Sequence, residues 1–369
     1  MCAYCDFVTV GGRAQDIGRY TDGLLAEMAS RPAPGQLRTI YFGGGTPSLM
    51  TGGQVARLVD AARERWGEVG LDEVTLEANP SERESPDWAG LRAAGVDRIS
   101  LGVQSLRDAD LVALTRGHTA REARDAYGAA RKAGFDNVSI DLIYGIPGQS
   151  REDWRKGLAE AIAMRPDHVS CYALQLALEP DEWAAPPRDG ALRWRNRMVP
   201  RQDDELAADQ YRAAEEILGA AGYEHYELSS WALSGRQSRH NGAYWARRAY
   251  TGLGTGAHSY NGIDERSWNT RNLDAYLGGT TSGERPVEGA ETLDEPTRAF
   301  EAIALGLRRV AGLSRHEFAV EFGADPVKRY ADAVGSTTTA GLLDVSGDCL
   351  RLSPAGRLLA TDVLVAFAR

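Results

Sequence analysis

Two periodicities alternate along the first two-thirds of the chain. Short apolar runs rich in β-branched residues have the length of buried strands, and they occupy Thr39–Phe42, Val74–Ala78, Ile99–Val103, Val138–Tyr144 and Val169–Leu174. Stretches with helical periodicity separate them, at Gln54–Arg65, Asp87–Ala94, Arg121–Ala133 and Arg151–Met164. This alternation of strands and helices predicts βαβ units and a parallel sheet.

The regular alternation ends after the fifth strand. The segment Leu178–Pro200, rich in Pro, Trp and Arg, is predicted to be an irregular excursion. A long helix at Asp203–Ala221 follows, and then a sixth apolar run, His225–Trp231, which we interpret as a further strand.

A second break in composition lies at Gly278–Glu295, where Gly, Thr and acidic residues cluster. Beyond it, helical patterns occupy Pro296–Val310, Ser314–Phe322 and Pro326–Ala333, followed by a hairpin-like stretch at Leu342–Leu352 and a final helix from Pro354. We therefore predict a barrel-like domain over residues 1–285 and a small, mainly helical domain over residues 286–369.

Composition excludes several classes of protein. Of the 369 residues, 43% are hydrophobic and 25% are charged, which is typical of a globular chain and excludes a disordered or fibrous one. The net charge of −10 argues against a nucleic-acid partner, because phosphate contacts need a basic patch. No apolar run approaches the length of a membrane span, and the first residues lack a secretory pattern. We expect a cytoplasmic protein.

Polar and glycine residues follow most of the predicted strands. They include the turn Gly43–Pro47, Glu77, Gln104 and Asp141. In barrels built of βα units the carboxyl ends of the strands form the active face, and glycines there let the backbone approach a ligand closely. Any one of these features is ordinary loop chemistry, but their recurrence along successive strands predicts a ligand site.

The chain has four cysteines, and Cys2 and Cys5 form a C-x-x-C pair. Alone, this pair is compatible with a redox dithiol, half of a zinc site or part of an iron–sulfur site. Cys171 lies in an apolar run and Cys349 beside a turn, where free thiols are unremarkable.

Several longer motifs identify a family. The Cys2–Cys5 segment, YFGGGTPSLM, LEANP, RISLGVQSL, GHT and NVSIDLIYGIPGQ resemble those of radical S-adenosylmethionine (SAM) proteins of the oxygen-independent coproporphyrinogen III oxidase group. The resemblance covers nearly the whole chain, including GLLDVSGDCLRLSPAGRLLA near its end. RHNGAYW resembles the H-N-x-x-Y motif of the HemW-type heme chaperone subgroup. The family resemblance as a whole implies a partial (β/α)6 TIM-like barrel with a HemN-type, winged-helix-like C-terminal domain.

The resemblance assigns Cys2 and Cys5 as ligands of a [4Fe-4S] cluster. The family motif is C-x-x-x-C-x-x-C, so its first cysteine would fall four residues before Cys2, upstream of Met1. We interpret this as a start that lacks the first cysteine and the first barrel strand. The alternative is a variant without a complete cluster.

The resemblance also assigns residues to SAM and to heme. Those implied for SAM are Gly44, Gly45, Thr46, Glu77, Gln104, Arg116 and Asp141. Those implied for heme are His240, since imidazole is a common iron ligand, and Tyr244, which would share a helical face with it. A hydrogen-bonded histidine that caps a turn is the alternative for His240, and His258 is a weaker candidate.

Two functions of different classes follow. The first is a heme chaperone that delivers heme to an acceptor such as a cytochrome or respiratory enzyme. The second is an oxidase that decarboxylates two propionates of coproporphyrinogen III by radical SAM chemistry. RHNGAYW favours the chaperone, whereas a missing cluster cysteine counts more heavily against the oxidase; a barrel that has lost both activities is a third alternative. The resemblance also allows a flavodoxin-type electron donor and a homodimer.

Overall fold

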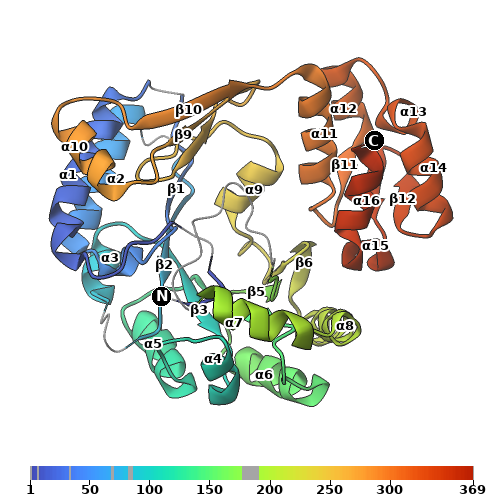
Figure 1. The fold of residues 1–369 in the computed structure, drawn as a ribbon, viewed down its shortest axis with the longest axis horizontal. Coiled ribbons are helices and arrows are strands. Elements are labelled where there is room, and N and C mark those ends of the chain that lie inside the picture. The colour runs from blue at the N-terminus through green and yellow to red at the C-terminus, as the bar shows by residue number, and fades with distance from the viewer. Residues whose placement is uncertain are drawn as a thin grey trace.

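The centre of the fold is a curled, mostly parallel sheet (Figure 1). The computed structural model describes residues 2–5, 8–32, 35–67, 70–81, 86–176 and 191–368. Within them the sheet has seven strands in the order β1-β2-β3-β4-β5-β7-β6. The parallel strands are β1 (Thr39–Phe42), β2 (Glu73–Ala78), β3 (Arg98–Gln104), β4 (Val138–Tyr144) and β5 (His168–Ala173). The five predicted strands are confirmed, as is the partial-barrel fold class.

Helices cover the outer face of this sheet (Figure 1). They are α1 (Ile17–Ser30), α2 (Gly52–Trp66), α3 (Trp88–Ala93), α4 (Asp108–Ala113), α5 (Ala120–Lys132), α6 (Arg151–Ala163) and α8 (Asp204–Ala220). In contrast, α7 (Ala191–Met198) buries Trp194 in a separate cluster with Ile143 and Leu174. The sequence specifies several of their starts, because Thr51, Thr119 and Ser150 each form a capping box with the third residue that follows.

The two faces of the parallel sheet differ in chemistry, because side chains alternate along each strand. The outer face is apolar and packs into the main hydrophobic core, where Leu76, Leu101 and Ile140 are fully buried. The inner face, which lines the barrel lumen, is polar. It carries Thr39, Tyr41, Glu73, Thr75, Glu77, Arg98, Ser100, Ser139, Asp141, His168 and Ser170.

The sixth predicted strand is wrong in one respect. The run His225–Trp231 forms a hairpin, with β6 (Glu224–Glu227) antiparallel to β7 (Ser230–Ala232) and β7 antiparallel to β5. The ring of His225 stacks on Trp231 at 4.2 Å between centroids, so a turn between two short strands buries both rings against each other. Of the predicted irregular segment Leu178–Pro200, residues 178–190 lie outside the described residues. The prediction is wrong for the rest of it that forms α7 (Ala191–Met198).

A smaller sheet follows the barrel, with the order β10-β9-β8. This part contains α9 (Arg239–Trp245), β8 (His258–Tyr260), β9 (Glu265–Asn269), α10 (Leu273–Thr281) and β10 (Val287–Thr292). β10 pairs with β9, so a strand after residue 285 hydrogen-bonds to one before it. The division into domains at this residue stays a prediction.

The C-terminal residues build a separate hydrophobic cluster around Ile303, Phe318 and Leu350. Its elements are α11 (Glu295–Gly306), β11 (Leu313–Ser314), α12 (Arg315–Phe322), α13 (Pro326–Arg329), α14 (Ala331–Thr339), β12 (Leu343–Ser346), β13 (Cys349–Leu352), α15 (Pro354–Leu358) and α16 (Ala360–Phe367). The predicted helices and hairpin are confirmed. Across the described ranges, no helix has both the length and the apolarity needed to cross a membrane.

The outer face of the sheet should dominate stability. Ile140 lies fully buried in the central strand β4, so Ile140→Ala leaves a cavity and should lower the free energy of unfolding by about 2–5 kcal/mol. Val112→Ala, at a side chain 76% exposed on α4, is the control and should change it by less than about 0.5 kcal/mol. Chemical denaturation measures both; equal effects would contradict this assignment of the core.

Candidate functional site

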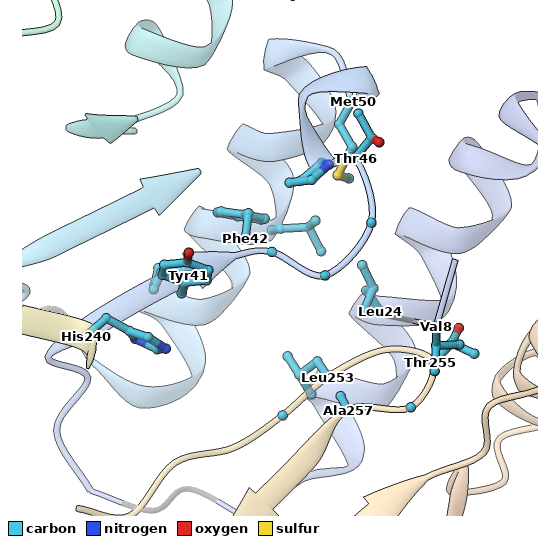
Figure 2. A pocket seen from close by; sticks show the side chains of 18 of the residues that line it. Val8, Leu24, Tyr41, Phe42, Thr46, Met50, His240, Leu253, Thr255 and Ala257 are labelled. Atoms are coloured by element: carbon cyan, nitrogen blue, oxygen red, sulfur yellow. The ribbon is translucent and has the colours of Figure 1, made fainter. Parts of the chain in front are cut away.

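A large cavity opens beside β1, an edge strand of the sheet, and all four residues of this strand line it (Figure 2). Its volume is about 2060 Å³, and its walls come from β1, the glycine turn after it, α9 and residues 252–258. Figure 2 shows Tyr41 and His240 side by side at one end and Thr46 at the other, with Leu253 and Ala257 on the facing wall. The cavity therefore joins four of the residues predicted for SAM (Gly44, Gly45, Thr46 and Arg116) to those predicted for heme.

Glu77 fixes the glycine turn. Its carboxylate accepts a hydrogen bond from the Tyr41 hydroxyl at 2.7 Å and one from the Gly44 N–H at 3.1 Å. A Cβ on Gly43 would lie 2.5 Å from the Tyr41 ring, so this position requires glycine. Burial raises the pKa of the Glu77 carboxyl, and its two hydrogen bonds oppose that rise. Gly44 and Gly45 have open space where a Cβ would stand, apart from Thr9 at 3.9 Å from Gly45.

A hydrogen-bonded series connects the glycine turn to the cysteine segment. Asn79 donates to the Thr46 hydroxyl at 3.2 Å and accepts from Arg116 at 2.9 Å. Arg116 also donates to the Gly102 carbonyl at 3.0 Å and to the Cys2 sulfur at 3.3 Å. The predicted residues Thr46, Arg116 and Cys2 are thus brought together, with Asn79 as the link between them.

The Cys2–Cys5 segment is a turn held from two sides. The Cys5 N–H donates to the Cys2 carbonyl at 3.3 Å, and the Ala3 N–H donates to the Thr115 hydroxyl at 2.9 Å. Arg195 of α7 donates to the Ala3 carbonyl at 3.4 Å. In the part of the chain that the structure describes, no three His, Cys, Asp or Glu side chains are grouped as a metal site. Cys2 lines this end of the cavity, whereas Cys5, three residues further on, is exposed.

Two predicted SAM residues lie deeper in the barrel. The Asp141 carboxylate accepts from the Ser100 hydroxyl at 3.1 Å, and burial raises its pKa. Gln104 ends β3 with a positive φ of 64°, a left-handed conformation that is uncommon for residues other than glycine. Glu77, Gln104 and Asp141 do not contribute to the cavity wall among the described residues, whereas Gly44, Gly45, Thr46 and Arg116 do.

His240 lies in the first turn of α9, so RHNGAYW is helical. Its Nδ1 lies 2.8 Å from the Thr39 hydroxyl and its Nε2 lies 2.9 Å from the Tyr244 hydroxyl, the residue one turn further on. The imidazole also stacks on the Tyr41 ring, with 4.8 Å between centroids. Both ring nitrogens are engaged, as in the hydrogen-bonded alternative. Ligation of heme by His240 and Tyr244 stays a prediction. His258 also lines the cavity.

Sequence reasoning missed two residues of this site. Tyr41 contacts both Glu77 and His240, and Asn79 connects Thr46 to Arg116. Both stand inside the motifs YFGGGTPSLM and LEANP. In both strands polar residues occupy every second position, Thr39 and Tyr41 in one and Glu73, Thr75 and Glu77 in the other. This alternation with apolar residues is the signal that could have indicated a lumen-facing side.

The burial of His240 has a measurable consequence. Burial lowers the pKa of its imidazole to about 4, well below that of a histidine in an unfolded chain. Because the unfolded chain then binds the proton more tightly, this group makes the fold less stable as the pH falls from about 6.5 toward 4. In the heme-free protein, an NMR titration of labelled imidazole should give His240 a midpoint near 4. A midpoint near 6.5 would contradict the burial of this ring.

Comparison with known proteins places the chain. Residues 1–160 match the Radical SAM superfamily and residues 293–359 match the HemN C-terminal domain. Proteins named heme chaperone HemW are 37% identical in Mycobacterium tuberculosis, covering 98% of this chain and 90% of the relative, and 31% identical in Escherichia coli, covering 99% and 94%.

The fold has a solved counterpart. Coproporphyrinogen III oxidase HemN from Escherichia coli superposes with a TM-score of 0.81 over 100% of this chain and 87% of that one. At 20% identity this likeness is one of fold, whereas the HemW proteins are similar in sequence along the whole chain. The chain belongs to the HemW family of radical SAM proteins.

Proposed function

We propose that this protein is a heme chaperone that binds heme in the cavity beside α9 and hands it to acceptor proteins. One observation carries the proposal: RHNGAYW forms a helix that presents His240 and Tyr244 to a cavity of about 2060 Å³. The names of the HemW relatives support it. The oxidase alternative has weaker support, because the HemN structure is 20% identical.

The hydrogen bonds of His240 suit a heme ligand that stays neutral. A metal-bound imidazole uses one nitrogen for the metal and is oriented by a hydrogen bond at the other. Here Nδ1 would keep its hydrogen bond to the Thr39 hydroxyl. Nε2, which faces the Tyr244 hydroxyl, would be free to bind heme iron once that hydroxyl turns away. Tyr41, stacked on the imidazole, restricts its rotation. Tyr244 then has two roles, covering Nε2 in the free protein and contacting the ligand in the complex.

Membership of the radical SAM superfamily implies SAM and a [4Fe-4S] cluster. The glycine turn fits SAM, since side chains at Gly44 and Gly45 would extend into open space that a ligand could fill. Cys2 and Cys5 are the proposed cluster thiolates, and the described residues offer no third ligand grouped with them. When bound and reduced, such a cluster supplies an electron that cleaves SAM.

The proposed roles of the chain's own residues follow from their contacts. Gly44, Gly45 and Thr46 would hold the amino-acid end of SAM, with Arg116 available to its carboxylate. Arg116 already donates to the Cys2 sulfur, so it would orient this proposed cluster ligand beside the glycine turn. Glu77, Gln104 and Asp141 remain proposed SAM contacts; Glu77 would have to exchange its bond to Gly44 for one to the ligand.

The proposed partners are heme and an acceptor such as a cytochrome or a respiratory enzyme, which the name of the relatives supports. A flavodoxin-type electron donor and a homodimer are further proposals from the family resemblance. We propose a cytoplasmic location because Cys2, Cys5, Cys171 and Cys349 are all free thiols, the state that a reducing compartment maintains.

Heme titration tests the proposed ligand. His240→Ala removes the only imidazole of RHNGAYW and should weaken heme binding by roughly tenfold, equivalent to about 1.4 kcal/mol, and shift the Soret band. His316→Ala, at an exposed histidine of α12, is the matched control and should behave like the unaltered protein. Identical spectra and titrations for His240→Ala and the unaltered protein would reject His240 as the ligand.

SAM binding tests the glycine turn. Gly45→Val meets no protein atom closer than Thr9, so the fold should survive, but the new side chain fills the space assigned to SAM. The affinity for SAM should fall roughly tenfold or more, because forcing extra methyl groups into an occupied space costs about 1–3 kcal/mol. Equilibrium dialysis after anaerobic cluster reconstitution measures it, with Gly53→Val, also at an open position, as control. Retained SAM binding in Gly45→Val would show that the turn is purely structural.

A further inference from the structure

A buried carboxylate of the barrel reaches the helix that carries His240. Glu73, at the first position of β2, is 3% exposed. Its Oε2 accepts the Arg239 N–H at 2.8 Å and its Oε1 accepts the His240 N–H at 3.2 Å. The Ser238 hydroxyl, 3.4 Å away, and the Thr75 hydroxyl, 3.1 Å away, donate to the same carboxylate. Two of these four donors are backbone groups of the first turn of α9.

The helix needs such an anchor. α9 has seven residues, and a helix of this length is not stable by itself in water. The first N–H groups of a helix have no partner inside it, and a negative charge placed there is favourable. Ser238 caps the Asn241 N–H at 3.2 Å, and Glu73 takes the two N–H groups before it. Together Ser238 and Glu73 accept hydrogen bonds from the N–H groups of the first three residues of α9.

This anchor controls the position of the imidazole. His240 is the second residue of α9, and both its backbone N–H and its ring are held by residues on the inner face of the sheet. Glu73 holds the N–H, while Thr39 of β1 lies 2.8 Å from Nδ1. Thr39 and Glu73 are directly paired across β1 and β2. Two neighbouring strands of the rigid sheet therefore determine where the His240 ring lies relative to the cavity.

We propose that Glu73 is a positioning residue for heme binding: its carboxylate holds the first turn of α9 and so places the His240 imidazole for ligation. The proposal rests on the proposed function, in which His240 binds heme. Glu73 itself lies behind the helix and does not line the cavity in the described part of the chain. It acts through His240, with no contact to heme.

The test compares heme titrations and Soret spectra of Glu73→Gln with those of the unaltered protein. The amide keeps one acceptor oxygen but turns N–H donors toward the helix, so the first turn of α9 loses its anchor. We expect heme affinity to fall by about tenfold, the loss typical of a broken charge-assisted hydrogen bond, with a broadened or shifted Soret band.

A matched control separates positioning from general damage. Asp97→Asn changes another carboxylate that accepts a backbone N–H of β2, that of Val74 at 2.9 Å, but no hydrogen bond of Asp97 reaches α9 in the described residues. It should bind heme like the unaltered protein at a comparable loss of thermal stability. If Asp97→Asn weakens heme binding as much as Glu73→Gln, or if Glu73→Gln leaves affinity and spectrum unchanged, the proposal is wrong.

Two further measurements keep the outcome clear. If Glu73→Gln fails to fold, Ser238→Ala replaces it in the test. This variant removes one hydroxyl from the same anchor and should produce the same change in the Soret spectrum to a smaller degree. In the heme-free protein, amide hydrogen exchange at Arg239 and His240 should accelerate in Glu73→Gln or Ser238→Ala, and unchanged exchange would overturn the proposal. If His240→Ala abolishes the heme spectrum while Glu73→Gln preserves it, the positioning role alone fails; if His240→Ala has no effect, the proposed function fails first.

Discussion

The register of the five parallel strands is the constraint on which the rest of the structure depends. Because side chains alternate along every strand and partners in register share a face, one face collects Leu76, Leu101 and Ile140 into the core. The other face then necessarily collects the polar residues, among them Glu73 and Glu77. A slip of one residue would exchange the two faces, so the apolar core and the polar lumen are specified together.

A polar lumen is costly unless its groups are hydrogen-bonded, and their partners are the elements that form the site. Glu77 takes the N–H of Gly44 and so shapes the turn proposed for SAM. Glu73 takes two N–H groups of α9 and so attaches the helix proposed for heme. Tyr41 lies between the two, bonded to Glu77 and stacked on His240. The site is thus built on strands that the core holds rigid.

The sequence predicted the elements better than their contacts. Periodicity was sufficient for the parallel strands and the capped helices, because each records burial or capping that is local in sequence. It failed at His225–Trp231, where one apolar run is divided into a hairpin. For α9 no periodicity is present in the sequence, and a helix there is only one of the conformations open to RHNGAYW. The motifs indicated Gly44, Glu77 and His240, but contacts such as Glu73 to His240 span 167 residues and leave no local signal.

A heme chaperone carries heme in order to release it, so the decisive experiment on this protein is heme transfer to an acceptor. The chain, loaded with heme, would be mixed with a heme-free cytochrome-type acceptor, separated from it, and both fractions read by their Soret absorbance. We expect heme to move to the acceptor, and to do so more completely from the unaltered protein than from His240→Ala. Heme that stays bound to the chain, or an acceptor that gains no more heme from it than from free heme, would contradict a chaperone function.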